Sequence, residues 1–154
     1  HGGANQKVMV MLQEIGDPSK AAGYVKALLA GKKKVMGFGH RVYKTEDPRA
    51  TILRRWCREL GEQTGQTKWP EICEIIEKVL LEEKGLHCNV DFYSAGVYHM
   101  LGIPTDLFTP IFAVSRVVGW TAHILEQYSD NRIIRPLCNY VGETDRKVTP
   151  IAQR

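Results

Sequence analysis

Three residues of this chain could move protons at neutral pH, namely His1, His40 and Asp91. His1 opens the segment HGGAN, His40 lies in GFGHRVYK at 37–44, and Asp91 lies in NVDFYS at 89–94. Imidazole and carboxylate groups are the usual general acids and bases of enzymes. The set therefore predicts an acid/base enzyme.

The segment around His40 combines two glycines, Gly37 and Gly39, with the cations Arg41 and Lys44. Glycines let backbone N–H groups approach a ligand closely, and cations favour phosphate or carboxylate groups. One interpretation is an anionic ligand beside a proton-donating imidazole. The other is a histidine that only caps the following segment, because GxG occurs in many turns.

Asp91 has the apolar and aromatic neighbours Val90, Phe92 and Tyr93 near the start of a predicted helix. A carboxylate in such surroundings loses hydration, which raises its pKa and makes it a stronger base. The alternative interpretation is an aspartate that caps the helix N-terminus. The two interpretations are compatible with each other, and only the first is catalytic.

Three arginines suit a substrate with two or three carboxylates. Arg116 lies between Phe112 and Trp120 at four-residue steps, so the three side chains would form an aromatic and cationic wall along one helix. A structural ion pair of Arg116 is the alternative. Arg49 and Arg135 each lie beside a proline, which restricts the local backbone.

Composition sets the class of protein. The 154 residues suffice for one compact unit, and 44% hydrophobic with 25% charged residues is typical of soluble proteins. No apolar run approaches the roughly 20 residues that span a bilayer, so we expect no membrane partner. The net charge is +4. The basic run 32–34 suits the C-terminal end of a helix better than a nucleic-acid surface, although surplus positive charge could also serve an anionic substrate.

Cysteine and histidine spacing predicts neither a disulfide framework nor a metal site. Cys57, Cys73, Cys88 and Cys138 form no CxxC pair, so a reducing cytoplasm is the expected location. His87, His99 and His123 have no spacing typical of metal ligands. The chain begins at His1 without a methionine, so we expect a numbering that starts inside a longer polypeptide or a cut chain.

Helix signals dominate and predict an all-α fold. Asp17–Pro18 and Asp47–Pro48 each combine a capping residue with a proline at the first helical position. With apolar residues at three- and four-residue spacing, these signals predict helices at about 4–15, 18–30, 48–64, 69–85, 90–101 and 110–128. Glycine and proline at 102–110 mark the expected domain boundary.

Five segments together resemble the C-terminal part of citrate synthases, of the bacterial and archaeal branch that also includes 2-methylcitrate synthases. They are HGGAN, GFGHRVYK with DPRA at 47–50, NVDFYS, SRVVGWTAHILEQ at 115–127, and RP at 135–136, in this order. The match covers essentially the whole chain. One departure is Ala95, where family members usually have glycine.

The resemblance implies a domain organisation and an assembly. Residues 1–102 would be the small domain, and residues 103–154 would be returning C-terminal helices of the large domain, whose remainder is absent. Family members are homodimers, and some are hexamers, so the intact enzyme would be a homodimer or a hexamer. Neither nucleic acid nor a membrane would be a partner.

The resemblance also implies an acyltransferase that condenses acetyl-CoA with oxaloacetate in the tricarboxylic acid cycle. Asp91 would deprotonate the acetyl group, His1 would stabilise the enolate, and His40 would polarise the oxaloacetate carbonyl. The substrate-binding residues would be Arg49, Phe112, Arg116 and Arg135, the last from a neighbouring subunit. Coenzyme A, a co-substrate rather than a tightly bound cofactor, would face Met36, Gly37, Phe38, Gly39, Lys44 and Lys84.

Three alternatives remain open. A 2-methylcitrate synthase would use propionyl-CoA, and the sequence does not separate it from a citrate synthase. An inactive fragment or subunit would need a missing N-terminal part. A citrate-cleaving lyase is disfavoured, because RVYK and DFYS resemble synthase motifs.

Overall fold

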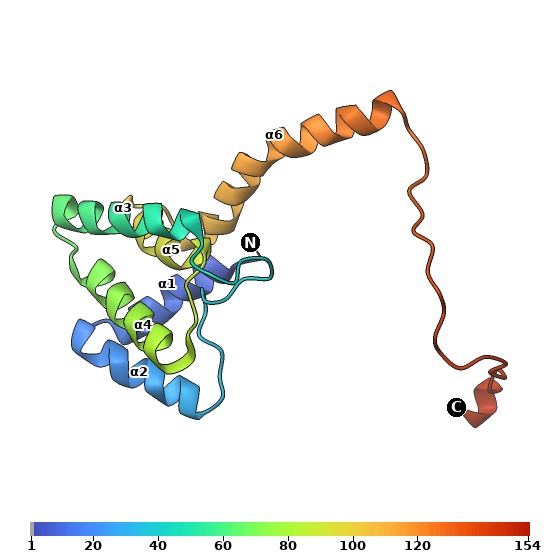
Figure 1. Ribbon diagram of the computed structural model, residues 1–154, viewed down its shortest axis with the longest axis horizontal. Coiled ribbons are helices and arrows are strands. Elements are labelled where there is room, and N and C mark those ends of the chain that lie inside the picture. Colours follow the sequence, from blue (N-terminus) through green and yellow to red (C-terminus); the bar gives the residue numbers. More distant parts are fainter. Residues whose placement is uncertain (1) are drawn as a thin grey trace. The chain divides into compact units, whose positions relative to one another are not determined.

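All regular structure in the described residues is helical. The computed structural model describes residues 2–154, so His1 lies outside the described residues. The helices are α1 (Ala4–Ile15), α2 (Pro18–Ala30), α3 (Pro48–Thr64), α4 (Lys68–Lys84), α5 (Val90–Met100) and α6 (Phe108–Ser129), with 3-10 turns η1 (Thr105–Leu107) and η2 (Ile151–Gln153) (Figure 1). The all-α prediction is confirmed.

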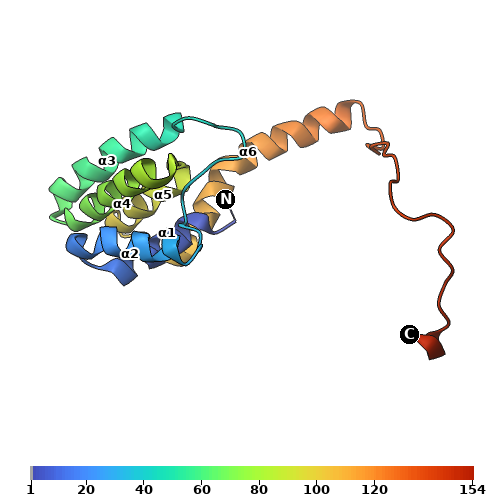
Figure 2. The same cartoon turned by 60° about the horizontal axis from the view of Figure 1, so that its bottom comes forward.

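The chain divides into two compact units, of which the first extends to Val118 and the second comprises Gly119–Arg154. In the first unit α5 packs against α1 and α3, and α2 packs against α4 (Figure 2). The predicted assignment of residues 1–102 and 103–154 to two domains stays a prediction.

The capping residues start the helices as predicted. Asp17 accepts a hydrogen bond from the backbone N–H of Ser19 at 2.8 Å, and Asp47 accepts one from Arg49 at 3.0 Å. In each case proline occupies the first helical position, where its missing N–H costs nothing. The two Asp–Pro pairs thus fix the starts of α2 and α3.

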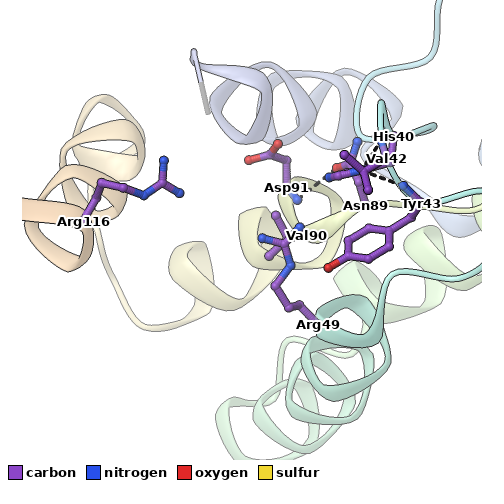
Figure 3. A pocket seen from close by; sticks show the side chains of 8 residues that line it. All are labelled: His40, Val42, Tyr43, Arg49, Asn89, Val90, Asp91 and Arg116. Carbon is purple, nitrogen blue, oxygen red and sulfur yellow. Dashed lines mark hydrogen bonds between the residues drawn. The ribbon is translucent and has the colours of Figure 1, made fainter. Parts of the chain in front are cut away.

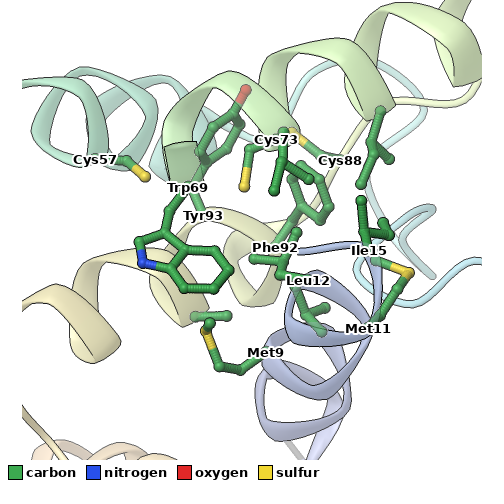
Figure 4. Packing of buried hydrophobic residues seen from close by; sticks show 14 of the residues in the cluster. Met9, Met11, Leu12, Ile15, Cys57, Trp69, Cys73, Cys88, Phe92 and Tyr93 are labelled. Atoms are coloured by element: carbon green, nitrogen blue, oxygen red, sulfur yellow. The ribbon is translucent and has the colours of Figure 1, made fainter. Parts of the chain in front are cut away.

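Helix α5 is the buried centre of the first unit. Every residue from Val90 to Val97 is buried, and Phe92 and Tyr93 are fully enclosed. Figure 4 shows these two rings between side chains of α1, such as Leu12, and of α4, such as Cys73. Each fully buried apolar side chain of this size stabilises the fold by roughly 1.5–3 kcal/mol.

A half-buried polar cluster links three helices at one edge of this core. Glu77 of α4 accepts hydrogen bonds from Arg54 of α3, Tyr93 of α5 and Cys88 just before α5. Burial alone would raise the pKa of Glu77, but the bonds from Tyr93 and Arg54 outweigh it and lower the pKa. Glu46 also pairs with Arg54. The charge of Arg54 is therefore compensated from two sides.

Ala95, which departs from the family pattern, lies in the middle of α5 and is fully buried. It is not among the residues with positive φ. A methyl group is compatible with helical dihedrals, so this substitution does not disturb the backbone that follows Asp91.

Helix α6 exposes most of its apolar residues. Only Phe108 is buried, whereas Val114 and Val118, which the sequence places on one apolar stripe, are 71% and 74% exposed. The apolar side chains of this stripe are therefore largely uncovered within the described part of the chain. After α6, residues 130–150 form no regular structure.

One helical stretch, Thr105–Ser129, is long and apolar enough to cross a membrane by length and composition alone. From the sequence we expected no apolar run of membrane-spanning length, and this stretch, which contains Arg116, departs from that expectation. Core helices of soluble proteins meet the same criterion, so a single such stretch is weak evidence for a membrane span.

The turn that carries His40 is attached to the start of α5. Phe38 and Cys88 form an isolated bridge, and the Asn89 N–H donates to the carbonyl of Gly37 at 2.9 Å. The Asn89 side-chain amide donates to the carbonyl of Gly39, also at 2.9 Å. These bonds bring two segments that are some fifty residues apart in sequence to one place.

We expect Gly37→Ala to destabilise the first unit more than Gly39→Ala. Both glycines have positive φ, +83° and +78°, so alanine costs about 1 kcal/mol of backbone strain at either position. At Gly37 a Cβ would also lie 2.8 Å from Phe92 Cβ, whereas nothing lies within 4 Å at Gly39. The steric conflict adds about 1–3 kcal/mol. Urea unfolding of both variants measures the difference, and equal losses would contradict the packing described here.

Candidate functional site

A pocket of about 400 Å³ brings together residues from four segments of the first unit. Its walls come from the turn before α3, the first turn of α3, the start of α5 and the middle of α6 (Figure 3). The lining residues are His40, Val42, Tyr43, Arg49, Asn89, Val90, Asp91 and Arg116. Four of them, His40, Arg49, Asp91 and Arg116, are predicted site residues.

The hydrogen bonds of His40 determine which ring nitrogen faces a ligand. Its Nδ1 accepts from the backbone N–H groups of Val42 and Tyr43, at 3.1 Å each. A neutral imidazole whose Nδ1 is an acceptor must carry its proton on Nε2. His40 therefore offers an N–H donor, and its ring is supported by that of Tyr43 at 4.5 Å between centroids.

Asp91 lies in the first turn of α5 and is 8% exposed. The capping residue is Asn89, whose side-chain oxygen accepts from the Asp91 N–H at 3.0 Å. The alternative reading of Asp91 as the N-cap is therefore wrong. Burial raises the pKa of the Asp91 carboxyl, and the nearby positive charge of Arg49 opposes this effect only in part. Such a carboxylate is a stronger base than an exposed one.

Arg49 is held on one side by a buried carboxylate. Its Nε and Nη2 donate to the two oxygens of Asp47 at 3.0 and 2.8 Å. These hydrogen bonds raise the pKa of Arg49, so its positive charge is secure. The guanidinium also lies 5.9 Å from the centroid of the Tyr43 ring. Its remaining N–H groups can serve a ligand in the pocket.

Arg116 is the cation that α6 contributes. Figure 3 shows its side chain extending toward the part of the pocket where Asp91 lies. It forms no ion pair with any carboxylate in residues 2–154. The structural ion pair that the sequence left open as an alternative is therefore not formed in this part of the chain.

One predicted substrate-binding residue, Phe112, is not among the residues that line this pocket. Phe112 is also a residue of α6, and its ring packs against that of Tyr98 with 6.2 Å between the centroids. Arg135 is exposed and belongs to the second unit, so its role stays a prediction. His1 lies outside the described residues, and its role also stays a prediction.

A separate basic pocket of about 500 Å³ contains two of the residues predicted to face coenzyme A, Phe38 and Lys84. Its other lining residues are Leu29, Lys32, Lys33, Lys34, Val35, Leu80 and Leu86. Gly39 and Lys44 instead line a neighbouring pocket of about 200 Å³ that also contains His40. Met36 and Gly37 line neither of these two pockets.

Sequence reasoning missed several of these residues. The sequence favours the C-terminal end of a helix for the lysines at 32–34, and in the structure they line a pocket together with Lys84. Their positive charge is the sequence feature that could have indicated this pocket. Asn89 and Asp47 were read only as parts of motifs or caps, yet both position the site. No group of three or more potential metal ligands occurs in residues 2–154.

This arrangement can polarise a carbonyl, remove a proton and hold carboxylates. The His40 N–H is the donor, Asp91 is the base, and Arg49 and Arg116 are the cations. The three functions together fit a reaction in which a carbon acid attacks a ketone that carries carboxylates.

A family model described as "Citrate synthase, C-terminal domain" matches residues 1–137. Among curated proteins, the chain is 56% identical to citrate synthase 2 of Bacillus subtilis and 54% identical to the citrate synthase of Haloferax volcanii. It is 47% identical to the 2-methylcitrate synthase of Shewanella oneidensis. Each match covers 100% of this chain, which spans 41% of the length of these relatives.

Solved structures show the same similarity in three dimensions. The citrate synthase of Thermotoga maritima matches with a TM-score of 0.79 and 46% identity, over 100% of this chain and 43% of that protein. A ternary complex of the Thermoplasma acidophilum citrate synthase with carboxymethyl coenzyme A and oxaloacetate matches with a TM-score of 0.81 and 38% identity. That match covers 100% of this chain and 42% of the other.

We expect Asp91→Asn to stabilise the fold at neutral pH. Because the folded state raises the pKa of Asp91, its favourable contribution is complete below the ordinary pKa of an aspartate, 3.8, and is lost as the pH rises through the folded pKa. Asparagine stays neutral and avoids this loss. Urea unfolding at about pH 7 and about pH 3 should show a gain for the variant that disappears at the lower pH. A variant no more stable than the native chain at neutral pH would contradict the assignment.

Proposed function

The chain belongs to the citrate synthase family, and on this premise we propose that it supplies catalytic residues for the condensation of acetyl-CoA with oxaloacetate to citrate and free CoA. The observation that carries the proposal is the pocket in which His40, Arg49, Asp91 and Arg116 meet. The proposed enzyme is an acyltransferase of the tricarboxylic acid cycle.

The first proposed step is proton transfer. Asp91 takes a proton from the methyl group of acetyl-CoA, and the electron pair of that C–H bond moves toward the thioester oxygen as an enolate. The raised pKa of Asp91 supports this role, since a stronger base needs less driving force from the substrate. His1 is proposed to donate a hydrogen bond to the thioester oxygen, in accordance with the family motif HGGAN.

The second proposed step forms the carbon–carbon bond. The enolate carbon attacks the ketone carbon of oxaloacetate while the Nε2–H of His40 donates to the ketone oxygen, where negative charge develops. The resulting alkoxide takes up one proton, equivalent to the one that Asp91 removed, to give citryl-CoA. Water then hydrolyses the thioester and releases citrate and CoA. The acceptor role of His40 Nδ1 supports this assignment, because it leaves the proton on Nε2.

The proposed carboxylate anchors are Arg49 and Arg116, with Arg135 from a neighbouring subunit and Phe112 beside the ligand. Arginine suits this role because its planar guanidinium binds a carboxylate through two parallel hydrogen bonds. Asp47 accepts one hydrogen bond from Nε and one from Nη2 of Arg49. The other N–H groups of the guanidinium can therefore bind a second carboxylate.

Coenzyme A is proposed to bind as a co-substrate, and no tightly bound cofactor is needed for these steps. The basic pocket with Lys84 and the lysines at 32–34 supports this, because its cations suit phosphate and its apolar residues suit an aromatic base. We further propose a homodimer in a reducing cytoplasm. The exposed apolar residues of α6, such as Val118 and Trp120, support a subunit contact.

The base assignment is tested with Asp91→Asn in the natural full-length protein. Amide nitrogen cannot accept the proton, so we expect kcat to fall by about 10²- to 10⁴-fold while the Kd of oxaloacetate is unchanged. The matched control is Asp106→Asn in η1, an exposed aspartate outside the pocket. Release of free CoA reports the rate, and calorimetry reports oxaloacetate binding. A near-native kcat for the Asp91 variant would overturn the mechanism.

A 2-methylcitrate synthase is the second candidate, because curated relatives with this activity, such as the Shewanella oneidensis protein, are 47% identical. It would accept propionyl-CoA in place of acetyl-CoA. The two candidates predict opposite ratios of kcat/KM for the two acyl-CoAs, measured on the same preparation at saturating oxaloacetate. A higher value for propionyl-CoA would favour the second candidate, and a higher value for acetyl-CoA would favour the first.

A further inference from the structure

Asp47 is a buried carboxylate beside the pocket that the proposed mechanism does not use. It is 1% exposed and ends the loop that leads into α3. A charged group at such a position costs stability unless all of its lone pairs find donors. The donors that surround it therefore indicate what it does.

Four N–H groups point at the two carboxylate oxygens of Asp47. Oδ1 accepts from the backbone N–H and from Nε of Arg49, at 3.0 Å each. Oδ2 accepts from Nη2 of Arg49 at 2.8 Å and from the backbone N–H of Val90 at 3.2 Å. A carboxylate has about four lone-pair sites, so its capacity is filled.

The geometry at Arg49 is that of a forked ion pair. A guanidinium has five N–H donors in one plane. Nε and Nη2 each direct one hydrogen bond at Asp47, and the remaining donors are available on the side that lines the pocket. Asp47 thereby fixes both the position and the plane of the group that would bind a substrate carboxylate.

The bond from Val90 extends the effect of Asp47 to the other wall of the pocket. Val90 is the first residue of α5 and directly precedes Asp91. One carboxylate thus connects the start of α3, which carries Arg49, with the start of α5, which carries the base. The distance between these two groups is restrained through a single side chain.

We propose that Asp47 is a positioning residue that orients Arg49 toward the substrate carboxylate and holds the start of α5 beside it. The inference rests on the proposed function, because it assumes that Arg49 binds oxaloacetate. It differs from a purely structural role, in which Asp47 would only cap α3.

Asp17 shows what such a purely structural cap looks like in the same chain. It also precedes a proline and accepts from a backbone N–H two residues later, at 2.8 Å. Its other partner is the hydroxyl of Ser19, and it is exposed. Asp17 and Asp47 therefore share the capping function, and only Asp47 adds the arginine and the second helix.

The experiment replaces each aspartate by serine in the natural full-length protein. Serine caps helices about as well as aspartate, but it carries no charge and cannot hold a guanidinium through two bonds. We expect Asp47→Ser to raise the Kd and the KM of oxaloacetate about tenfold or more, and Asp17→Ser to change them less than about twofold. Native-like oxaloacetate binding by a folded Asp47→Ser variant would overturn the inference.

A double-mutant cycle with Arg49→Lys separates positioning from a general loss of stability. If Asp47 acts through Arg49, adding Asp47→Ser to Arg49→Lys should weaken oxaloacetate binding by less than Asp47→Ser does alone. If the fold-losses in oxaloacetate affinity of the two single variants simply multiply in the double variant, the inference is overturned. Asp47→Asn, which keeps the shape of the side chain, replaces Asp47→Ser in both measurements if serine prevents folding. If the unmutated protein binds no oxaloacetate, the proposed function itself fails and the inference falls with it.

Discussion

The burial of α5 is the constraint on which the rest of the first unit depends. A helix N-terminus has backbone N–H groups without partners in the helix, and inside a protein each must be satisfied. In α5 the N–H of Val90 bonds to Asp47 and that of Asp91 bonds to Asn89. The side chain of Asn89 in turn holds the turn that carries His40. The need to satisfy a buried helix end thus assembles the walls of the pocket.

The same burial that stabilises the core destabilises the charge that the chemistry needs. Apolar surroundings raise the pKa of Asp91, which favours proton abstraction and costs stability at neutral pH. Asp47, which is also buried, has its pKa lowered, because the bonds from Arg49 and Val90 outweigh the effect of burial. At Asp47 the hydrogen bonds therefore decide the direction of the pKa shift, whereas at Asp91 burial decides it.

Helix α6 and the segment after it contrast with this compact core. Most of the apolar side chains of α6 are exposed, and residues such as Ile133 and Leu137 are almost fully accessible. Isolated exposed apolar residues are common, but a series of them along one segment is typical of a surface that packs against further protein. The cation that α6 contributes to the pocket, Arg116, lies at the border between these two environments.

The sequence by itself determined the helices, two of their starts and the family, because periodicity, Asp–Pro caps and short motifs are local properties. It also identified His40 and Asp91 as residues with acid/base chemistry. Only the tertiary structure decided that Asn89 rather than Asp91 caps α5, and that Asp47 binds Val90 as well as Arg49. These contacts join segments more than forty residues apart or depend on burial, and neither can be read from local spacing. Packing around α5, rather than any motif, therefore sets the geometry of the site.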